Sequence, residues 1–232
     1  MPAAAFSCRM AVVGERNTRM QAIILSVRAT GKNNGLVTML TREEGLKTSL
    51  LYGGPKSRMR SLVQPFNSGS VWLYEDKAKE SSKITDFEVT GFHMQLKASL
   101  YKIMAATLAA EIVIKTRAAG EPEGAFVLLS AFLDGTDVSG EDEARLGTIR
   151  FLWRYLGLLG VQPEAGDCAG KYGLDADAAG YLEAMNTRSP GEVRRIILPA
   201  SSARQLKDMT FGLIGEAAGC RLSTIETGFS IL

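Results

Sequence analysis

Between Met20 and Gly91 the sequence breaks into five short apolar segments that are separated by turn signals. Asn34-Gly35, in the first of these turns, is a strong hairpin signal because both residues tolerate the positive φ angles of a tight turn. Five short strands that arrive as hairpins suggest a closed or half-closed barrel, and a five-stranded barrel of the OB type is the most economical arrangement. The predicted strands are 22–27, 36–41, 46–52, 70–74 and 84–91.

Near Leu96 the hydrophobic period changes from that of strands to that of helices. The predicted helices are 96–115, one that starts at 121–123, one from 141 to Gly160, short pieces at 176–185 and 193–198, and 202–218. The stretch 160–173 is predicted to be a loop. The fold class expected is therefore α+β and multidomain, with an OB-type β-barrel at 20–92 and an all-α helical domain at 93–232. Residues 1–19 are expected to be a mobile extension, with a start site assigned too early as the alternative.

A glycine hinge and three cations follow the third predicted strand. Gly53 and Gly54 precede Lys56, Arg58 and Arg60 on what is predicted to be a loop. Glycine lets the backbone approach a ligand closely, and Lys and Arg neutralise phosphates, so the loop is a candidate phosphate contact. A solvated surface loop is the alternative. Tyr52, beside the hinge, is the best-placed aromatic residue for stacking on a base.

The distribution of charge supports a polyanion as the ligand of the front half. Residues 20–73 contain seven Lys or Arg against two Glu, whereas residues 96–232 contain fourteen Lys or Arg against seventeen Asp or Glu. A basic front and a mildly acidic rear suggest that one part of the chain faces a polyanion and the other does not.

The sequence gives no positive support for an enzyme. It contains no Walker-type loop, dinucleotide fingerprint or HExxH motif, and its single histidine, His93, is interpreted as structural. Cys8, Cys168 and Cys220 are widely spaced and form no disulfide framework, which indicates a reducing cytosol. No secretory signal or bilayer-spanning apolar run is present, so no membrane association is expected.

Four motifs, taken in order, resemble the bacterial recombination mediator family RecO. They are GKNNGLVTMLTREEG (31–45), GGPKSR (53–58), LVQPF (62–66) and LLGVQP (158–163). The resemblance extends over residues 20–232 and is most specific over 20–75.

The resemblance implies a non-enzymatic DNA-binding protein of the RecF pathway of DNA repair. It implies binding of single- and double-stranded DNA, annealing of complementary strands, and help in loading the recombinase onto strands coated by single-strand-binding protein. The implied partners are DNA, RecR and the acidic, apolar-ended tail of the single-strand-binding protein, with RecF and RecA as indirect partners. The implied location is the cytoplasm, in association with the nucleoid.

The family's DNA-contacting basic residues on the barrel can be carried over to this sequence. They correspond to Arg28, Lys32, Arg42, Lys47, Lys56, Arg58 and Arg60, and Tyr52 joins them as a candidate for stacking. Many relatives carry a four-cysteine zinc site in the helical domain. Here Cys168 matches its first position, but Lys171 stands at the second, so we expect that the zinc site is lost and that no metal or other cofactor is bound.

Two other classes of function stay open at this point. One is a protein-interaction adaptor whose helical part docks partners and whose barrel binds nucleic acid only incidentally. The other is an RNA-binding OB-type protein without annealing activity.

Overall fold

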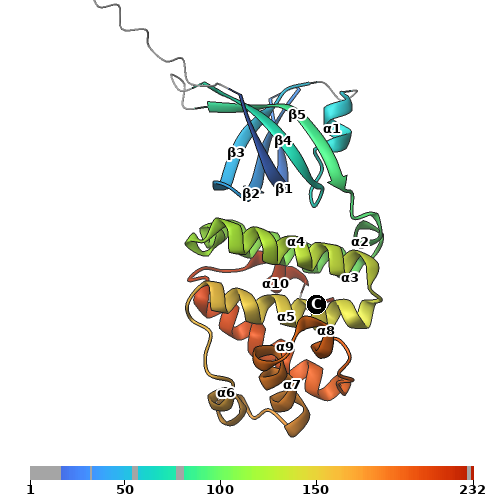
Figure 1. Cartoon of the computed structure of the whole chain (residues 1–232), viewed down its shortest axis with the longest axis vertical. Coiled ribbons are helices and arrows are strands. Elements are labelled where there is room, and N and C mark those ends of the chain that lie inside the picture. Colours follow the sequence, from blue (N-terminus) through green and yellow to red (C-terminus); the bar gives the residue numbers. More distant parts are fainter. Residues whose placement is uncertain (1–16, 32, 54–56, 77–80, 229–230) are drawn as a thin grey trace, which may run out of the picture.

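The computed structural model describes residues 17–31, 33–53, 57–76, 81–228 and 231–232. A β-barrel formed by the first part of the chain lies on a stack of helices formed by the rest (Figure 1). The prediction of an OB-type barrel followed by a helical region is confirmed.

The five strands close into a barrel in the order β1-β2-β3-β5-β4. The strands are β1 (Asn17–Thr30), β2 (Asn34–Thr41), β3 (Gly45–Leu51), β4 (Ser68–Asp76) and β5 (Ser81–Gly91). Neighbouring strands are antiparallel except for β3 and β5, which meet in parallel at Leu50 and Lys83. Alternate side chains fill the interior with apolar groups such as Ile24, Met39 and Phe87, as the period of a strand requires.

The basic segment after β3 differs from its prediction as a loop. Lys56 lies outside the described residues, but Arg58 and Arg60 belong to a short helix, α1 (Arg58–Leu62). The neighbouring apolar residues Met59, Leu62 and Val63 have helical spacing and pack against the barrel core. This packing explains why a turn of helix forms here, with the two arginines carried on it.

Helices α2 to α10 form the remainder of the described chain. They are α2 (Met94–Ala98), α3 (Leu100–Lys115), α4 (Pro122–Val138), α5 (Glu141–Leu158), α6 (Ala165–Tyr172), α7 (Ala176–Thr187), α8 (Pro190–Val193), α9 (Ala200–Ala217) and α10 (Ser223–Gly228), with a 3-10 turn, η1 (Arg117–Gly120). None of the helices in the described residues is both long enough and apolar enough to cross a bilayer.

Three helix predictions are wrong in detail, each for a local reason. The helix expected at 96–115 is interrupted at Ser99, whose side chain caps α3 by accepting from the Lys102 amide. The expected loop at 160–173 contains α6, which buries Ala165 and Cys168. Only Val193 of the piece expected at 193–198 is helical. Helix α8 begins earlier, where Ser189 and Glu192 form a capping box with Pro190 at the first helical position, and it ends at Val193.

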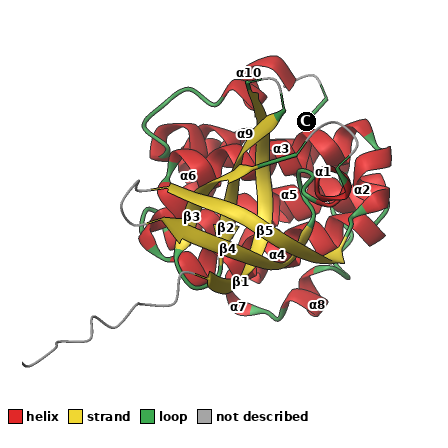
Figure 2. Ribbon diagram, turned by 90° about the horizontal axis from the view of Figure 1, so that it is seen from above, coloured by secondary structure: helices red, strands yellow, loops and turns green. Residues whose placement is uncertain are grey.

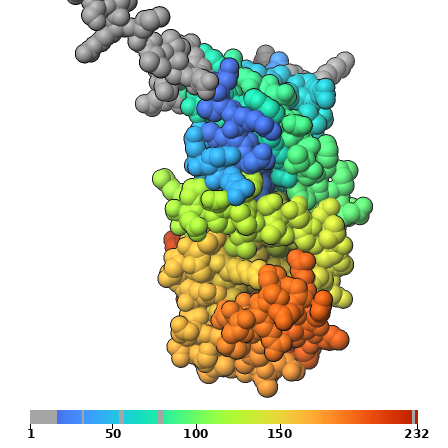
Figure 3. Space-filling model, viewed as in Figure 1, coloured from blue at the N-terminus to red at the C-terminus, as the bar shows by residue number. Residues whose placement is uncertain are grey.

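The barrel lies against the helices (Figures 1–3), and apolar residues of both parts belong to one buried cluster. Barrel residues that belong to the same apolar cluster as the helices are Ile23, Leu25, Leu40 and Phe66. The buried ring of His93 adds polar contacts across this interface. Its Nδ1 donates to the Phe66 carbonyl at 2.6 Å, and its Nε2 lies 2.9 Å from Asp134 Oδ1 on α4. The separation of the chain into two domains at residues 92 and 93 stays a prediction.

The start of α10 is held to α3 by one carboxylate. Glu111 accepts hydrogen bonds from the Ser223 amide (2.8 Å) and the Thr224 amide (2.9 Å), and it pairs with Lys115 at 2.8 Å. Burial acts to raise the pKa of Glu111, but the hydrogen bonds from Lys115, Thr224 and Ser223 outweigh it and lower the pKa to about 2.

We expect Glu111→Gln to reduce the free energy of unfolding by about 1–3 kcal/mol at pH 7, because it removes charge-assisted hydrogen bonds. The pKa of Glu111 is depressed from its ordinary 4.5. Its contribution is therefore complete above pH 4.5 and is lost as the pH falls towards 2. Urea unfolding of wild type and variant across this range should show the difference shrinking. Glu183→Gln, on an exposed position of α7, is the control; equal losses in the two variants would contradict the prediction.

Candidate nucleic-acid interface

The predicted DNA-contacting residues fall into three groups in the structure. Lys32 and Lys56 lie outside the described residues. Lys47 and Arg42 have carboxylate partners. Arg28, Tyr52, Arg58 and Arg60 make up the third group and are at least partly exposed.

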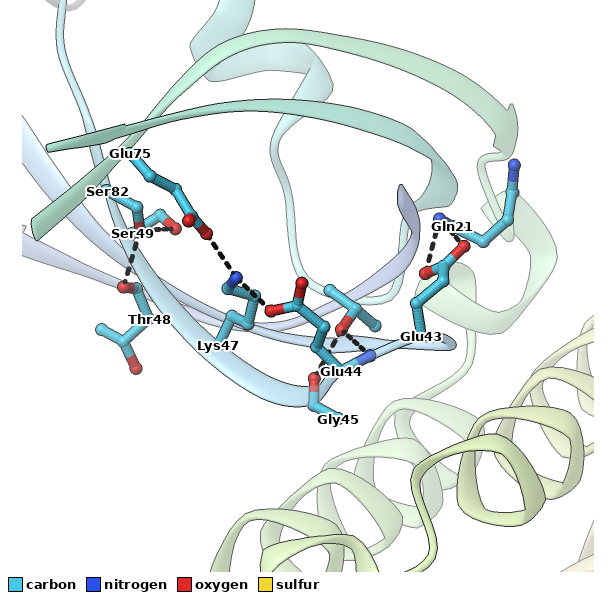
Figure 4. A network of polar contacts seen from close by, with 10 residues as sticks. Gln21, Glu43, Glu44, Gly45, Lys47, Thr48, Ser49, Glu75 and Ser82 are labelled. Atoms are coloured by element: carbon cyan, nitrogen blue, oxygen red, sulfur yellow. Dashed lines mark hydrogen bonds and ion pairs between the residues drawn. The ribbon is translucent and has the colours of Figure 1, made fainter. Parts of the chain in front are cut away.

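Lys47 is part of the closure of the barrel. Its ammonium lies 2.5 Å from Glu44 and 2.6 Å from Glu75, and its side chain is only 16% exposed (Figure 4). Although burial acts to lower the pKa of Lys47, hydrogen bonds to both glutamates raise it above its ordinary value. Beside it, Ser49 of β3 and Ser82 of β5 share a 2.6 Å hydrogen bond. Lys47 therefore neutralises barrel carboxylates at the junction of β3 with β4 and β5.

Arg42 points to the helical region instead of to an open face. Its guanidinium lies 2.6 Å from Glu123 of α4, and this hydrogen bond, followed by the charge of Glu123, raises the pKa of Arg42. Both side chains are at least half exposed. An exposed pair of this kind contributes little to stability. Glu123 nevertheless neutralises the charge of Arg42.

Arg28 and Tyr52 lie at the same end of the barrel. The strand register pairs Arg28 with Leu36 and Leu36 with Leu50, and Tyr52 follows directly after β3. The side chain of Tyr52 is 52% exposed. Within the described part of the chain, no carboxylate forms an ion pair with Arg28, Arg58 or Arg60. We call Arg28, Arg58, Arg60 and Tyr52 the open cation group. They leave three positive charges and one aromatic ring accessible to a ligand.

Sequence reasoning did not include two aromatic residues of β4, Trp72 and Tyr74, among the candidate site residues. Both lie half-buried on the outside of the barrel. The guanidinium of Arg19 lies 5.1 Å from the centre of the Trp72 ring, and the Lys83 ammonium lies 4.7 Å from that of Tyr74. The signal was present in the alternation of β4, because Val71 and Leu73 fill the interior.

The residues around α6 do not fit a zinc site. Cys168 is buried in α6, where burial and then the charge of Asp167 raise the pKa of its thiol. In the described ranges, no group of three or more His, Cys, Asp or Glu side chains is placed to hold a metal ion. Tetrahedral zinc requires such a set.

Comparisons with known proteins agree with this geometry. The family model described as "Recombination protein O N terminal" matches residues 16–93, the length of the barrel. The chain is 33% identical over 153 residues to the "DNA repair protein RecO" of Bradyrhizobium diazoefficiens, which covers 64% of this chain and 59% of that protein. It is 31% identical over 180 residues to the protein of the same name from Rhodopseudomonas palustris strain BisB18, covering 75% and 66%.

A more distant organism gives a similar match. The "DNA repair protein RecO" of Heliobacterium modesticaldum is 30% identical over 152 residues, covering 65% of this chain and 54% of that protein. The chain thus spans somewhat more than half the length of most of these relatives.

We expect Lys47→Gln to reduce the free energy of unfolding by about 1–3 kcal/mol, because the largely buried ammonium would be lost and the partly buried Glu75 would lose its partner. Arg28→Gln removes the same charge at an exposed position, and it should change stability by less than about 0.5 kcal/mol. Urea unfolding measures both. Lys47→Gln/Glu75→Gln should cost less than the sum of the two single changes; strict additivity would show that Lys47 does not act through Glu75.

Proposed function

Because this chain belongs to the RecO family of DNA repair proteins, we propose that it is a non-enzymatic, DNA-binding recombination mediator. In this proposal it binds single- and double-stranded DNA, anneals complementary strands and helps to load the recombinase onto strands coated by single-strand-binding protein. RecR is a proposed direct partner, RecF and RecA are indirect ones, and the cytoplasm is the proposed location. The observation that carries the proposal is the match of the barrel to this family's N-terminal model.

The open cation group supports DNA as the ligand of the barrel. OB-type barrels bind single strands by combining cations that follow the phosphates with aromatic faces on which bases stack. Arg28, Arg58 and Arg60 provide the cations and Tyr52 provides the ring. Arg42 and Lys47 are weaker candidates than the sequence suggested, because a phosphate would have to replace a carboxylate that is already paired.

A cleft between α5 and α9 is our proposed site for the tail of the single-strand-binding protein. It has a volume of about 470 Å³, within the usual range for ligand pockets. Its apolar walls include Ile149 and Phe211, and Arg145, Arg204 and Lys207 line it together with a single acid, Asp142. Apolar walls beside cations suit a peptide that is acidic and ends in apolar side chains and a carboxylate.

We expect Arg58→Gln/Arg60→Gln to weaken binding of single-stranded DNA, because two phosphate contacts would be lost. The slope of log K against log[salt] should become shallower by about 1.4, at about 0.7 for each contact to a single strand. Fluorescence anisotropy across a salt series measures this. Arg188→Gln/Arg195→Gln removes the same charge from exposed positions of the helical region.

If the two double variants lose affinity equally, the barrel arginines act only through net charge and are not the contact. A clear preference of the wild type for RNA over DNA of the same sequence would instead favour an RNA-binding function.

We expect Arg204→Glu to weaken binding of a synthetic peptide with acidic residues and an apolar C-terminus by about tenfold or more. Losing a charge-assisted hydrogen bond costs about 1.5–3 kcal/mol, and 1.4 kcal/mol is tenfold in affinity. Arg188→Glu, with the same charge change on the exposed end of α7, should bind the peptide as the wild type does. Isothermal titration calorimetry with the full chain gives both values. Unchanged affinity in Arg204→Glu would remove the cleft between α5 and α9 from consideration.

A further inference from the structure

Three arginines meet around a small cavity on the helical region, remote in sequence from the barrel. Arg150 and Arg154 are one helical turn apart on α5, and Arg194 follows directly after α8. All three line a cavity of about 70 Å³, and Glu143 is the only acidic residue among those that line it.

Two of the arginines share that one carboxylate. Arg150 is almost fully buried, donates to the Tyr181 hydroxyl at 2.7 Å and pairs with Glu143. Arg194 is 55% exposed and its Nε lies 3.9 Å from the same Glu143 oxygen, at the limit of an ion pair. Glu143 therefore balances the charge of the buried Arg150, and it balances that of the more exposed Arg194 only weakly.

Arg154 has no carboxylate partner among the residues that the structure describes. Burial, and then repulsion from Arg150 and Arg194, lowers the pKa of its guanidinium. Like charges one helical turn apart destabilise a helix, and a partly buried charge normally has a partner. The cavity thus carries positive charge that nothing in the described chain balances.

A glycine on the α4 wall leaves room for one of these side chains. A Cβ at Gly135 would lie only 3.1 Å from Nη2 of Arg194, closer than an ordinary van der Waals contact. Thr136 and Ser139 also line the cavity, and the Ser139 hydroxyl donates to the Thr136 carbonyl at 3.4 Å. Three guanidinium groups therefore line one small space.

We propose that this cavity, which we call the arginine cavity, binds a phosphate group. A planar guanidinium fork matches the oxygens of a phosphate, and several forks around one anion give strong charge-assisted hydrogen bonds. A volume of about 70 Å³ has room for roughly five water molecules, which is space for a tetrahedral oxyanion but not for a peptide segment. The phosphate can come from a nucleic acid backbone or from a free small molecule, and the chemistry is the same in both.

The test compares melting temperatures of the full chain in inorganic phosphate and in chloride at equal ionic strength. Wild type should gain about 3–6 °C at a phosphate concentration ten times its Kd. Arg154→Gln/Arg194→Gln should lose this gain, and Arg154→Gln should melt about 1 °C higher than wild type in chloride because repulsion is relieved. Arg195→Gln, adjacent in sequence and exposed, should behave as wild type. Arg150 is left intact because it holds Tyr181 and Glu143.

Two results would overturn the proposal. If the rise in melting temperature in phosphate persists in Arg154→Gln/Arg194→Gln, it is the general stabilisation of proteins by phosphate, which is excluded from their surface. If an acidic peptide raises the melting temperature and phosphate does not, the cavity is a carboxylate site.

If the rise in melting temperature depends on the arginines, the salt dependence of DNA binding identifies where the bound phosphate group comes from. A shallower slope in Arg154→Gln/Arg194→Gln than in Arg195→Gln assigns the site to the DNA backbone, and equal slopes assign it to a free phosphate. Because the melting test uses no DNA, it can succeed or fail independently of the function proposed for the barrel.

Discussion

The apolar interface between the barrel and the helices is the contact on which the rest of the structure depends. Ile23, Leu25, Leu40 and Phe66 belong to the same buried cluster as the helical core. Burying a side chain of this size contributes about 1.5–3 kcal/mol. The exposed Arg42–Glu123 pair across the same interface contributes at most about 1 kcal/mol. Apolar burial therefore supplies most of the free energy that holds the barrel against the helices, and the exposed ion pair adds little.

This interface also decides which part of the barrel is available to a ligand. OB-type barrels commonly bind through the outer face of the second and third strands. Here Leu40 of β2 and Leu46 of β3 pack against the helices, so part of that face is covered. The opposite ends of β2 and β3, near Leu36 and Tyr52, stay exposed. The geometry thus favours a ligand that approaches the end of the barrel near the β1–β2 turn.

The elements that the sequence predicted well are those specified by local pattern. The strands and the long helices α4, α5 and α9 follow from alternation and from periodic apolar residues. Helix α1 was missed because its apolar residues are interleaved with cations, which look like a solvated loop. The partners of Lys47 and Arg42 could not be predicted, since Glu75 and Glu123 lie 28 and 81 residues further along the chain and only the tertiary fold brings them close.

Those distant carboxylates change how the charge of the chain should be interpreted. A net charge of +2 says little, and the excess of cations in residues 20–73 overstates what the barrel offers, because two of those cations are paired. Conversely, the helical region is acidic overall, yet Arg154 has no carboxylate partner in the described structure. What a ligand encounters is the charge that remains after the fold has placed its own acids. Sequence counts locate cations, but the arrangement of neighbouring carboxylates determines which of them can bind an anion.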